Sequence, residues 1–478
     1  MKTKSKALEG IKWFSLAQLI GNILSLIRMP LIAFFITPSE YGIMSIIYML
    51  MALGTIFSDS GIGKAWIQKQ TDDRPIFNTL FWLNIIVCIT VYFILFIMKD
   101  LVSLLFNDSD LSIYIPFACL GIIISSFGQQ YSFLLDKELK FKQKAVVNFS
   151  SSIIGFLVII ILLNLDLKLW ALIFTNLIST FIKSIWFLII GFKIQPLGFK
   201  FDFKKLRELL KFGFYQLGQR LTNFVYTNID YLLIGTLINT TVLGLYYMAY
   251  SIVIKPISIL NPVINKITFP IFSKIQNNIK QLQSSFLSIN KTLSFLVVPF
   301  YIVLIFMAPN IFEVFFNEKW SDAIPLIQIL SIVGYLRVIK NIAGNISLSK
   351  GDASLGFKYN LLSLFTYIPA VYFGASIDGA RGIAISIAFA QIILIIPFYK
   401  LMIQKVFIGF LKDYLSSIFP SLIIGFKFAV VLALVNYITK DVKILYALTI
   451  QLIISGLFLF LTYYNNKDVR EIYLKIKS

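Results

Sequence analysis

The sequence predicts an all-α integral membrane protein with about fourteen transmembrane helices. Of its 478 residues, 58% are hydrophobic and only 14% are charged, whereas soluble globular chains are about half apolar and a quarter charged. The apolar residues form runs of about twenty, the length that crosses roughly 30 Å of hydrocarbon. In addition, basic residues gather in every second polar break between these runs, as they do in loops on the cytoplasmic side of a membrane.

The expected spans follow one another with short polar breaks between them. A basic segment precedes the first span, which is about 25 residues long and therefore too long for the core of a signal peptide, so we expect it to be retained. The fourteen predicted spans are 11–36, 41–63, 76–98, 113–134, 145–164, 168–191, 208–236, 242–265, 287–308, 323–348, 355–376, 382–400, 414–437 and 443–464.

The distribution of the 43 Lys and Arg residues orients these spans. Most of them lie in alternate breaks, beginning at the N-terminus, and the intervening breaks carry mainly acidic residues such as Asp108, Asp110 and Glu313. An even number of spans then places both termini in the cytoplasm. We therefore expect a multi-pass protein of the cell inner (cytoplasmic) membrane whose basic loops contact anionic membrane lipids.

The composition also argues against several classes of function. The net charge of +20 is explained by topology, and because the basic residues are scattered over short loops, nucleic acid is not an expected partner. No break is long enough for a nucleotide-binding domain or for the outer domain of a glycosyl transferase or polymerase. The absence of histidine removes the commonest general acid or base and metal ligand, and Cys88 and Cys119 fall within apolar spans. We therefore expect no enzyme, no catalytic residue, no metal site and no cofactor.

An internal repeat is visible at an offset of 202 residues. Tyr41-Gly42 at the start of the second span corresponds to Leu243-Gly244 at the start of the eighth. At the same offset a polar face of the first span corresponds to a polar face of the seventh, and both faces have the spacing of one side of a helix. Six spans separate the copies, so both run in the same direction, as in transporters with parallel repeats.

Ionisable residues at membrane depth cost about 2.5 to 3.5 kcal/mol each on insertion scales and usually face a bundle interior or a watery cavity. Basic residues outnumber acidic ones here. Such a surplus suits an anionic substrate, since an Arg side chain holds a phosphate through two parallel hydrogen bonds. The residues are Arg28, Lys183, Arg220, Lys255, Arg337, Lys340 and Lys427 against Asp59 and Asp230.

Four of these ionisable residues lie in the spans that the repeat relates, namely the first, second and seventh: Arg28, Asp59, Arg220 and Asp230. Arg28 lines a cavity or reaches the outer membrane surface, whereas Arg220 lies halfway along its span and is expected to line the cavity. Asp230, ten residues further on, forms either a structural ion pair with Arg28 or a site for coupling and gating. Asp59 is a second coupling candidate, with a role at the end of its helix beside Lys64 as the alternative.

The remaining candidates lie in the second half of the chain. Lys255 precedes Pro256 in the middle of a span, where proline kinks a helix, and the kink serves either packing or a binding site. Arg337 and Lys340 share one helical face and are expected to line the cavity, although polar stripes also join helices to one another. The sequence does not decide whether Lys183 and Lys427 line a cavity or extend to the membrane interface.

Several segments of the chain resemble a known family, the Wzx-type polysaccharide and O-antigen flippases of the multidrug/oligosaccharidyl-lipid/polysaccharide (MOP) exporter superfamily. The similarity runs over essentially the whole chain and is most specific around the seventh and eighth spans. The segments that carry it are Pro38–Gly42, Phe57–Gly61, Leu210–Gly218, Asn228–Gly235, Leu243–Tyr250, Phe269–Gln276 and Leu348–Gly351.

The resemblance implies a MATE-like fold of two pseudo-symmetric six-helix lobes that form a V around a central cavity, plus two C-terminal helices. It divides the chain into an N-lobe (1–206, spans 1–6), a C-lobe (207–405, spans 7–12), and a segment with spans 13–14 and a cytoplasmic tail (406–478). In such folds spans 1, 2, 7 and 8 line the cavity, which places Arg28, Arg220, Asp230 and Lys255 near it.

The expected function is ion-coupled alternating access that moves an undecaprenyl-pyrophosphate-linked oligosaccharide unit across the cytoplasmic membrane for O-antigen, capsule or exopolysaccharide biosynthesis. Substrate-binding residues would be Arg28, Arg220, Lys255, Arg337 and Lys340, with Asp230 and Asp59 in coupling or gating. Expected partners are the polyprenyl pyrophosphate, H⁺ or Na⁺, a polysaccharide polymerase and a chain-length regulator. The alternatives are a flippase for the peptidoglycan lipid precursor and a multidrug or cation antiporter of the same superfamily.

Overall fold

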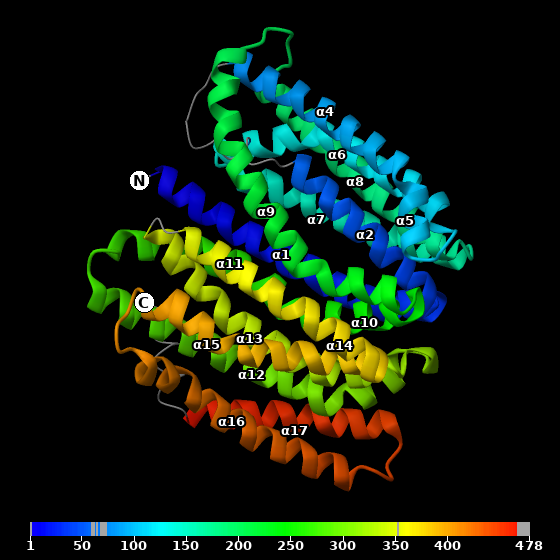
Figure 1. Ribbon diagram of the computed structural model, residues 1–478, viewed down its shortest axis with the longest axis vertical. Helices are drawn as coiled ribbons and strands as arrows, with labels where there is room; N and C mark the ends of the chain where they lie inside the picture. The colour runs from blue at the N-terminus through cyan, green and yellow to red at the C-terminus, as the bar shows by residue number, and fades with distance from the viewer. Residues whose placement is uncertain (1, 59–62, 64–65, 67–73, 351–352, 466–478) are drawn as a thin grey trace. The chain divides into compact units, whose positions relative to one another are not determined.

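The computed structural model describes residues 2–58, 63, 66, 74–350 and 353–465. In these ranges the chain is helical and contains no strand (Figure 1). The helices up to residue 237 are α1 (Lys2–Phe35), α2 (Pro38–Ser58), α4 (Arg74–Ile97), α5 (Lys99–Leu105), α6 (Leu111–Lys137), α7 (Phe141–Asn164), α8 (Lys168–Ile194) and α9 (Phe203–Leu237). They are followed by α10 (Thr240–Val253), α11 (Lys255–Ile275), α12 (Ile279–Phe315), η1 (Glu318–Trp320), α13 (Ala323–Ser349), α14 (Ala353–Ile393), α15 (Ile395–Phe398), η2 (Tyr399–Gln404), α16 (Leu411–Ile438) and α17 (Ile444–Asn465).

Among the described residues, eleven helices are long and apolar enough to cross a membrane, or twelve if one bent pair counts as a single span. Many large apolar side chains on them are exposed, among them Phe365, Phe426 and Phe460. Such a surface suits lipid better than water. The predictions of an all-helical fold and of a multi-pass membrane protein are thus confirmed, and the exact number of fourteen spans stays a prediction.

Helix α14 contains the break that we predicted between residues 376 and 382. Asp378 and Gly379 have non-helical dihedral angles, and Gly379 has a φ of 48°. The backbones of Gly374 and Gly382 touch across this break, and the side chain of Gln391 donates a hydrogen bond to the hydroxyl of Tyr367. The two halves of α14 are therefore antiparallel and form a helical hairpin.

The predicted kink at Pro256 is also present. Helix α10 ends at Val253, α11 begins at Lys255, and the two are bent by 43°. Proline lies in the first turn of α11, where its missing N–H costs nothing because that donor has no partner within the helix.

Residues 1–244 form one compact unit and residues 245–478 a second. The first unit includes α9, which packs against α2 and α4. This division by compactness does not test the lobe boundaries at 206 and 405 that the resemblance implies, and these boundaries stay predictions.

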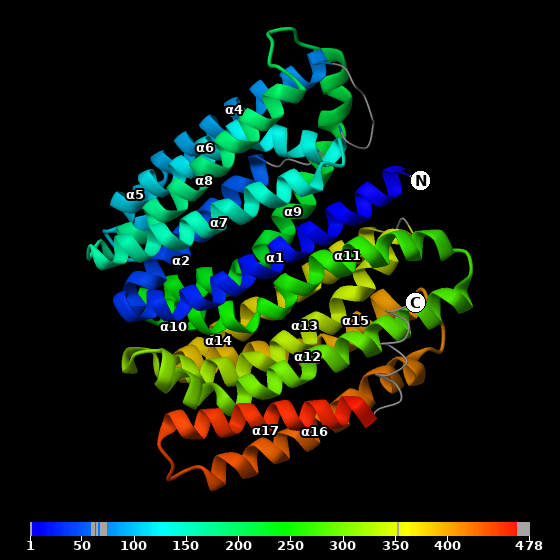
Figure 2. The ribbon, with the colours of Figure 1, turned by 180° about the vertical axis from the view of Figure 1, so that it is seen from behind.

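In the first unit, α6 and α8 run side by side, with α4 and α7 beside them (Figures 1 and 2). Glycine permits this close approach: a Cβ on Gly128 of α6 would lie 2.6 Å from the Cα of Ser184 of α8. Rings from α4 and α6 fill the adjoining core, where Phe77 and Tyr131 have centroids 5.3 Å apart. The packing fixes α8 and the polar residues that it carries.

The start of α2 crosses the first turn of α10 within this unit. A Cβ on Gly42 would overlap the carbonyl oxygen of Thr240, and a Cβ on Gly244 would overlap that of Pro38. These four residues are related in pairs by the offset of 202, so the two copies of the repeat touch at equivalent positions. The Oγ atom of Ser39 also lies 3.1 Å from the Oγ1 atom of Thr240.

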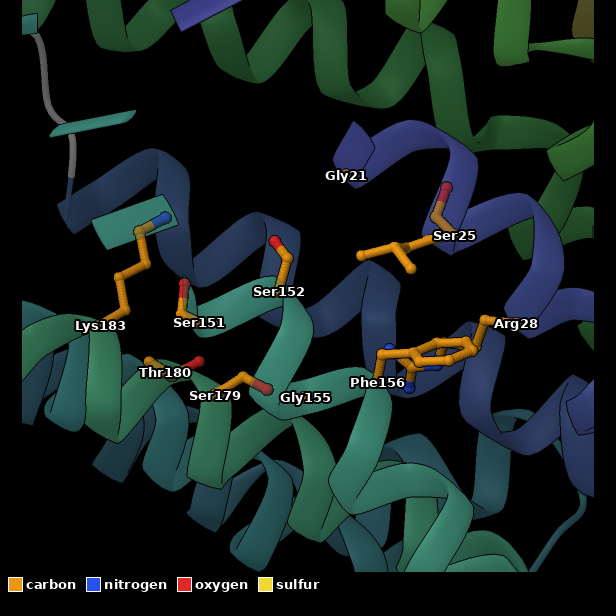
Figure 3. A pocket seen from close by; sticks show the side chains of 11 residues that line it. Gly21, Ser25, Arg28, Ser151, Ser152, Gly155, Phe156, Ser179, Thr180 and Lys183 are labelled. Atoms are coloured by element: carbon orange, nitrogen blue, oxygen red, sulfur yellow. The ribbon is translucent and has the colours of Figure 1, made fainter. Parts of the chain in front are cut away.

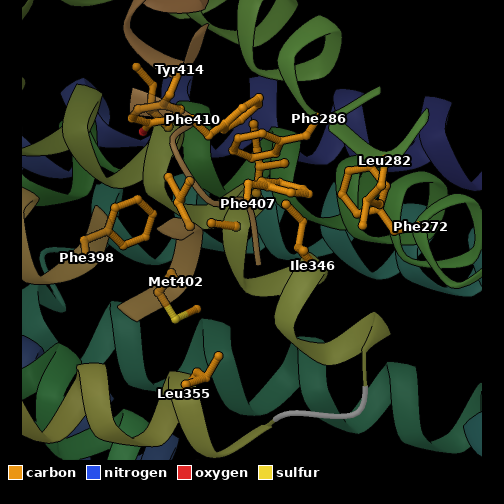
Figure 4. Close-up of a cluster of buried hydrophobic side chains, with 14 of the residues drawn as sticks. Phe272, Leu282, Phe286, Ile346, Leu355, Phe398, Met402, Phe407, Phe410 and Tyr414 are labelled. Atoms are coloured by element: carbon orange, nitrogen blue, oxygen red, sulfur yellow. The ribbon is translucent and has the colours of Figure 1, made fainter. Parts of the chain in front are cut away.

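The second unit is held by an aromatic core and by hydrogen bonds between polar side chains. Phe286 of α12 packs among Phe407, Phe410 and Tyr414 (Figure 4). Helices α11 and α13 are joined by two hydrogen bonds, one from Asn341 to Asn261 and one of 2.8 Å from Asn345 to Thr268. Part of the polar face of α13 therefore serves to join helices.

Candidate functional site

A polar cavity of about 300 Å³ lies within the membrane-spanning part of the first unit, between α1, α7 and α8. We call it the first pocket. Small residues make it possible, because Gly21 of α1 lies close to Ser152 of α7 and Gly155 of α7 lies against Ser179 of α8. Its lining consists of Gly21, Leu24, Ser25, Arg28, Ser151, Ser152, Gly155, Phe156, Ser179, Thr180 and Lys183.

Two basic side chains face the first pocket from opposite ends. Figure 3 shows Lys183 at one end and Arg28 beside Phe156 at the other, with the serine hydroxyls between them. The Nε atom of Arg28 is buried and has no hydrogen-bond partner in the described part of the chain. A buried donor without a partner is costly, so this end of the cavity is suited to an acceptor supplied by a ligand.

A second cavity of about 420 Å³, the second pocket, lies between α2, α6, α8 and α9. It shares Thr180 and Lys183 with the first pocket, so Lys183 lies in the wall between the two. Arg220 of α9 is its other basic residue. The complete lining is Thr55, Ile56, Ser58, Ser125, Gly128, Gln129, Ser132, Thr180, Lys183, Ser184, Phe187 and Arg220.

The electrostatic character of both pockets is positive. Arg28, Lys183 and Arg220 line them, and no acidic residue is among the described residues of either lining. Placing three cations in a membrane-spanning region is expensive. The pockets therefore fit a ligand with negative charge and with polar groups for the hydroxyls.

The sequence does not decide whether Lys183 lines a cavity, and the structure places it in the wall between the two pockets. A signal for it exists in α8, where Asn176, Thr180 and Lys183 recur at helical spacing and share one face. The sequence does not show that this stripe lines a cavity, because α8 is otherwise strongly apolar. The structure places the predicted residues Arg28 and Arg220 in the first and second pocket, respectively.

Of the two acidic candidates, Asp230 is not among the residues that line the first or the second pocket. Asp230 is buried in α9, and one of its carboxylate oxygens accepts a 3.0 Å hydrogen bond from the backbone N–H of Tyr231. Arg28 and Asp230 form no ion pair in the part of the chain that the structure describes. Asp59 lies outside the described residues.

The other three predicted residues belong to the second unit. Lys255 is the first residue of α11, at the bend. The guanidinium carbon of Arg337 lies 5.3 Å from the ring centroid of Tyr250. Lys340 donates hydrogen bonds to the hydroxyl of Tyr359, at 3.3 Å, and to the side chain of Gln391. None of the three lines the first or the second pocket, and their role in substrate binding stays a prediction.

Comparison with known sequences gives consistent results over most of the chain. A family model described as "Polysaccharide biosynthesis protein" matches residues 31–325. The lipopolysaccharide biosynthesis protein WzxC of Escherichia coli K12 is 28% identical over 443 residues, covering 90% of this chain and 89% of WzxC. The teichuronic acid biosynthesis protein TuaB of Bacillus subtilis 168 is 27% identical over 431 residues, covering 90% and 88% of the two chains.

Solved structures share the fold at low sequence identity. The lipid II flippase MurJ in an inward closed conformation superimposes with a TM-score of 0.70 and 18% identity, covering 95% of this chain and 99% of MurJ. An inward-facing multidrug resistance transporter of the MATE family, a member of the MOP superfamily, gives a TM-score of 0.63 at 12% identity, covering 82% and 98%. The expected MATE-like fold is therefore confirmed, and the MurJ structure shares it.

Proposed function

Because the chain belongs to the family of polysaccharide biosynthesis proteins, we propose that it is a flippase that moves a polyprenyl-pyrophosphate-linked oligosaccharide across the cytoplasmic membrane for surface polysaccharide biosynthesis. The observation that carries this proposal is the pair of adjoining cavities lined by Arg28, Lys183 and Arg220. A pyrophosphate joined to a sugar presents anionic oxygens beside many hydroxyl groups. Both kinds of group have counterparts in these linings.

Transport is proposed to follow from alternating access. Fourteen spans in two six-helix lobes with two further C-terminal helices would place both termini in the cytoplasm, and H⁺ or Na⁺ would couple to the cycle. Burial makes Asp230 a candidate coupling or gating residue, since protonation or cation binding would relieve the cost of its charge. A polysaccharide polymerase and a chain-length regulator are the proposed protein partners.

The two alternatives share the fold. A multidrug or cation antiporter would need anionic groups to attract its substrates, and the lining of both pockets has the opposite charge. A flippase for the peptidoglycan lipid precursor would bind the same anionic group. The two functions are distinguished by which glycan, surface polysaccharide or peptidoglycan, depends on the protein.

The test is deletion of the gene, followed by analysis of the surface glycan and of polyprenyl-linked intermediates. We expect the loss of one surface polysaccharide and the accumulation of its complete lipid-linked unit on the cytoplasmic face. Arrest of peptidoglycan synthesis would assign the protein to the peptidoglycan precursor. A normal glycan with new sensitivity to cationic dyes would overturn the proposal in favour of drug export.

A further inference from the structure

Helix α16 packs within the second unit through one face and exposes another. It contacts α12 and α17 (Figures 1 and 2). Toward α12 it presents small residues: Ser417 accepts a 3.0 Å hydrogen bond from the side chain of Asn290, and a Cβ on Gly425 would lie 2.4 Å from the Cγ1 atom of Val298. This close packing fixes which residues of α16 lie on the surface of the unit.

Lys427 lies on the exposed side of α16. It has no hydrogen-bond, ion-pair or ring partner among the residues that the structure describes. Residues four before, three after and seven after a given position share its side of a helix, and here they are the exposed apolar residues Ile423, Val430 and Leu434. We call these three residues and Lys427 the lysine face. It combines a single cation with apolar side chains.

The depth of Lys427 makes its exposure costly. At about 1.5 Å per residue, Lys427 lies about 24 Å from the first residue of α16, Leu411, and about 16 Å from the last, Ile438. Side chains on a helix lean toward its N-terminal end, which is here the more distant one. Lys427 is therefore poorly placed to extend to a polar surface of the membrane, and an unpaired ammonium group at this depth would face hydrocarbon.

We propose that the lysine face docks a membrane-spanning helix of another protein, and that this helix carries an Asp or Glu at mid-depth. An ion pair with that carboxylate removes the cost of exposing Lys427 to lipid, and the apolar residues of the face pack against the rest of the partner helix. Anionic lipid head groups lie at the membrane surfaces and do not reach this depth. A second copy of this chain fits less well, because Asp230 is buried in α9. The inference is independent of the flippase function.

The test measures the association of the full-length protein with two synthetic membrane-spanning peptides in liposomes. Both peptides consist of about twenty apolar residues, with a central Glu in one and a central Gln in the other. Fluorescence energy transfer between labelled peptide and labelled protein gives the two affinities. We expect the Glu peptide to bind on the order of tenfold more tightly, because an ion pair in hydrocarbon is stronger than the hydrogen bond of an amide. Equal affinities would overturn the proposal.

Variants assign the effect to Lys427. Lys427→Gln is expected to remove the difference between the two peptides, and Lys427→Glu to transfer the preference to a peptide with a central Lys. Lys412→Gln is the matched control: it removes an exposed basic residue from the first turn of the same helix and is expected to leave the preference for the Glu peptide intact. A preference for that peptide that survives Lys427→Gln would contradict the role of the lysine.

The occupant of the face is tested in the cell. A photoreactive amino acid in place of Phe426, which precedes Lys427 and is 71% exposed, cross-links whatever covers this side of α16. We expect an adduct with another membrane protein, joined beside an Asp or Glu of one of its membrane-spanning helices, and loss of that adduct in Lys427→Gln. An adduct with a second copy of this chain, or with lipid alone, would overturn the proposal.

Discussion

Two lysines within the membrane-spanning helices have different surroundings: Lys183 lines cavities, whereas Lys340 is hydrogen bonded to side chains of another helix. Lys183 lies in the wall between two cavities. Lys340 has its ammonium group hydrogen bonded to Tyr359 and Gln391 of α14, and Gln391 in turn donates to Tyr367. The surroundings of Lys340 are thus those of a cation that joins two helices.

We therefore expect Lys340→Ala to destabilise the protein by about 1–3 kcal/mol, the cost of leaving buried polar partners unsatisfied. Thermal unfolding in detergent measures the effect, with Lys427→Ala as a control on the exposed face of α16. Transport per folded molecule should be unchanged. Loss of transport at full stability would show instead that Lys340 binds substrate, as the sequence predicts.

Asp108, in the segment between α5 and α6, gives a prediction for pH. Partial burial raises the pKa of its carboxyl group and the nearby Asp110 carboxylate adds to this, while hydrogen bonds from the Asp110 backbone N–H and from Thr240 oppose it. The folded state then holds this proton more tightly than the unfolded state. The contribution of Asp108 to stability consequently falls as the pH rises from the unfolded pKa through the folded one.

Asp108→Asn is expected to give a small gain in melting temperature at pH 7 and none below about pH 4, the ordinary range of this carboxyl group. The gain is small because the side chain is partly exposed and solvent screens its charge. The exposed Asp100→Asn serves as the control. A gain of equal size at all pH values would contradict the role of the charge.

At the scale of elements, the breaks in helices could be predicted from sequence more reliably than the helix ends. Pro256 and Gly379 act through their own backbones, so both breaks lie where the local sequence places them. Helices extend beyond the predicted membrane spans: α9 begins at Phe203 and α12 at Ile279, whereas the corresponding spans are predicted to begin at 208 and 287. Hydropathy marks the hydrocarbon layer, whereas helical hydrogen bonding continues into the polar region beyond it.

The hairpin in α14 depends on a glycine. Gly379 has a φ of 48°, which side chains disfavour, and a Cβ there would meet no atom within 4 Å. We expect Gly379→Ala to cost about 1–3 kcal/mol from backbone strain alone. Gly356→Ala in the same helix also adds a methyl group in open space, and because its backbone is helical, it should be neutral or slightly stabilising. Equal melting temperatures for the two variants would contradict this reading.

At the scale of the whole molecule, the all-helical MATE-like fold, the family and two of the three cations of the pockets could be predicted from the sequence. Lys183 could not, because a stripe of polar residues does not reveal which other helices face it. The polar face of α13 shows the converse, since Asn341 and Asn345 carry the same pattern and bond to α11. Only tertiary contacts distinguish a stripe that lines a cavity from one that joins helices.

The crossing of α2 and α10 predicts a non-additive pair of variants. Gly42→Ala and Gly244→Ala each place a methyl group against backbone of the partner helix, so each should lower stability by pushing the helices apart. Once they are apart, the second methyl group meets less resistance. We expect the double variant to be less destabilised than the sum of the two single variants, as measured by unfolding in detergent. Full additivity would show that the two contacts are independent.

The burial of both native thiols has a practical consequence for this crossing. Cys88 and Cys119 are inaccessible, so cysteines introduced at Ser39 and Thr240, whose hydroxyl oxygens are 3.1 Å apart, would be the accessible pair for an oxidant. If the two helices separate there during transport, the cross-linked protein should stop flipping substrate and recover when a reductant is added. Continued flipping while the cross-link is intact would show that the two helices stay in contact at this crossing throughout the transport cycle, so that the crossing acts as a fixed point of the conformational change.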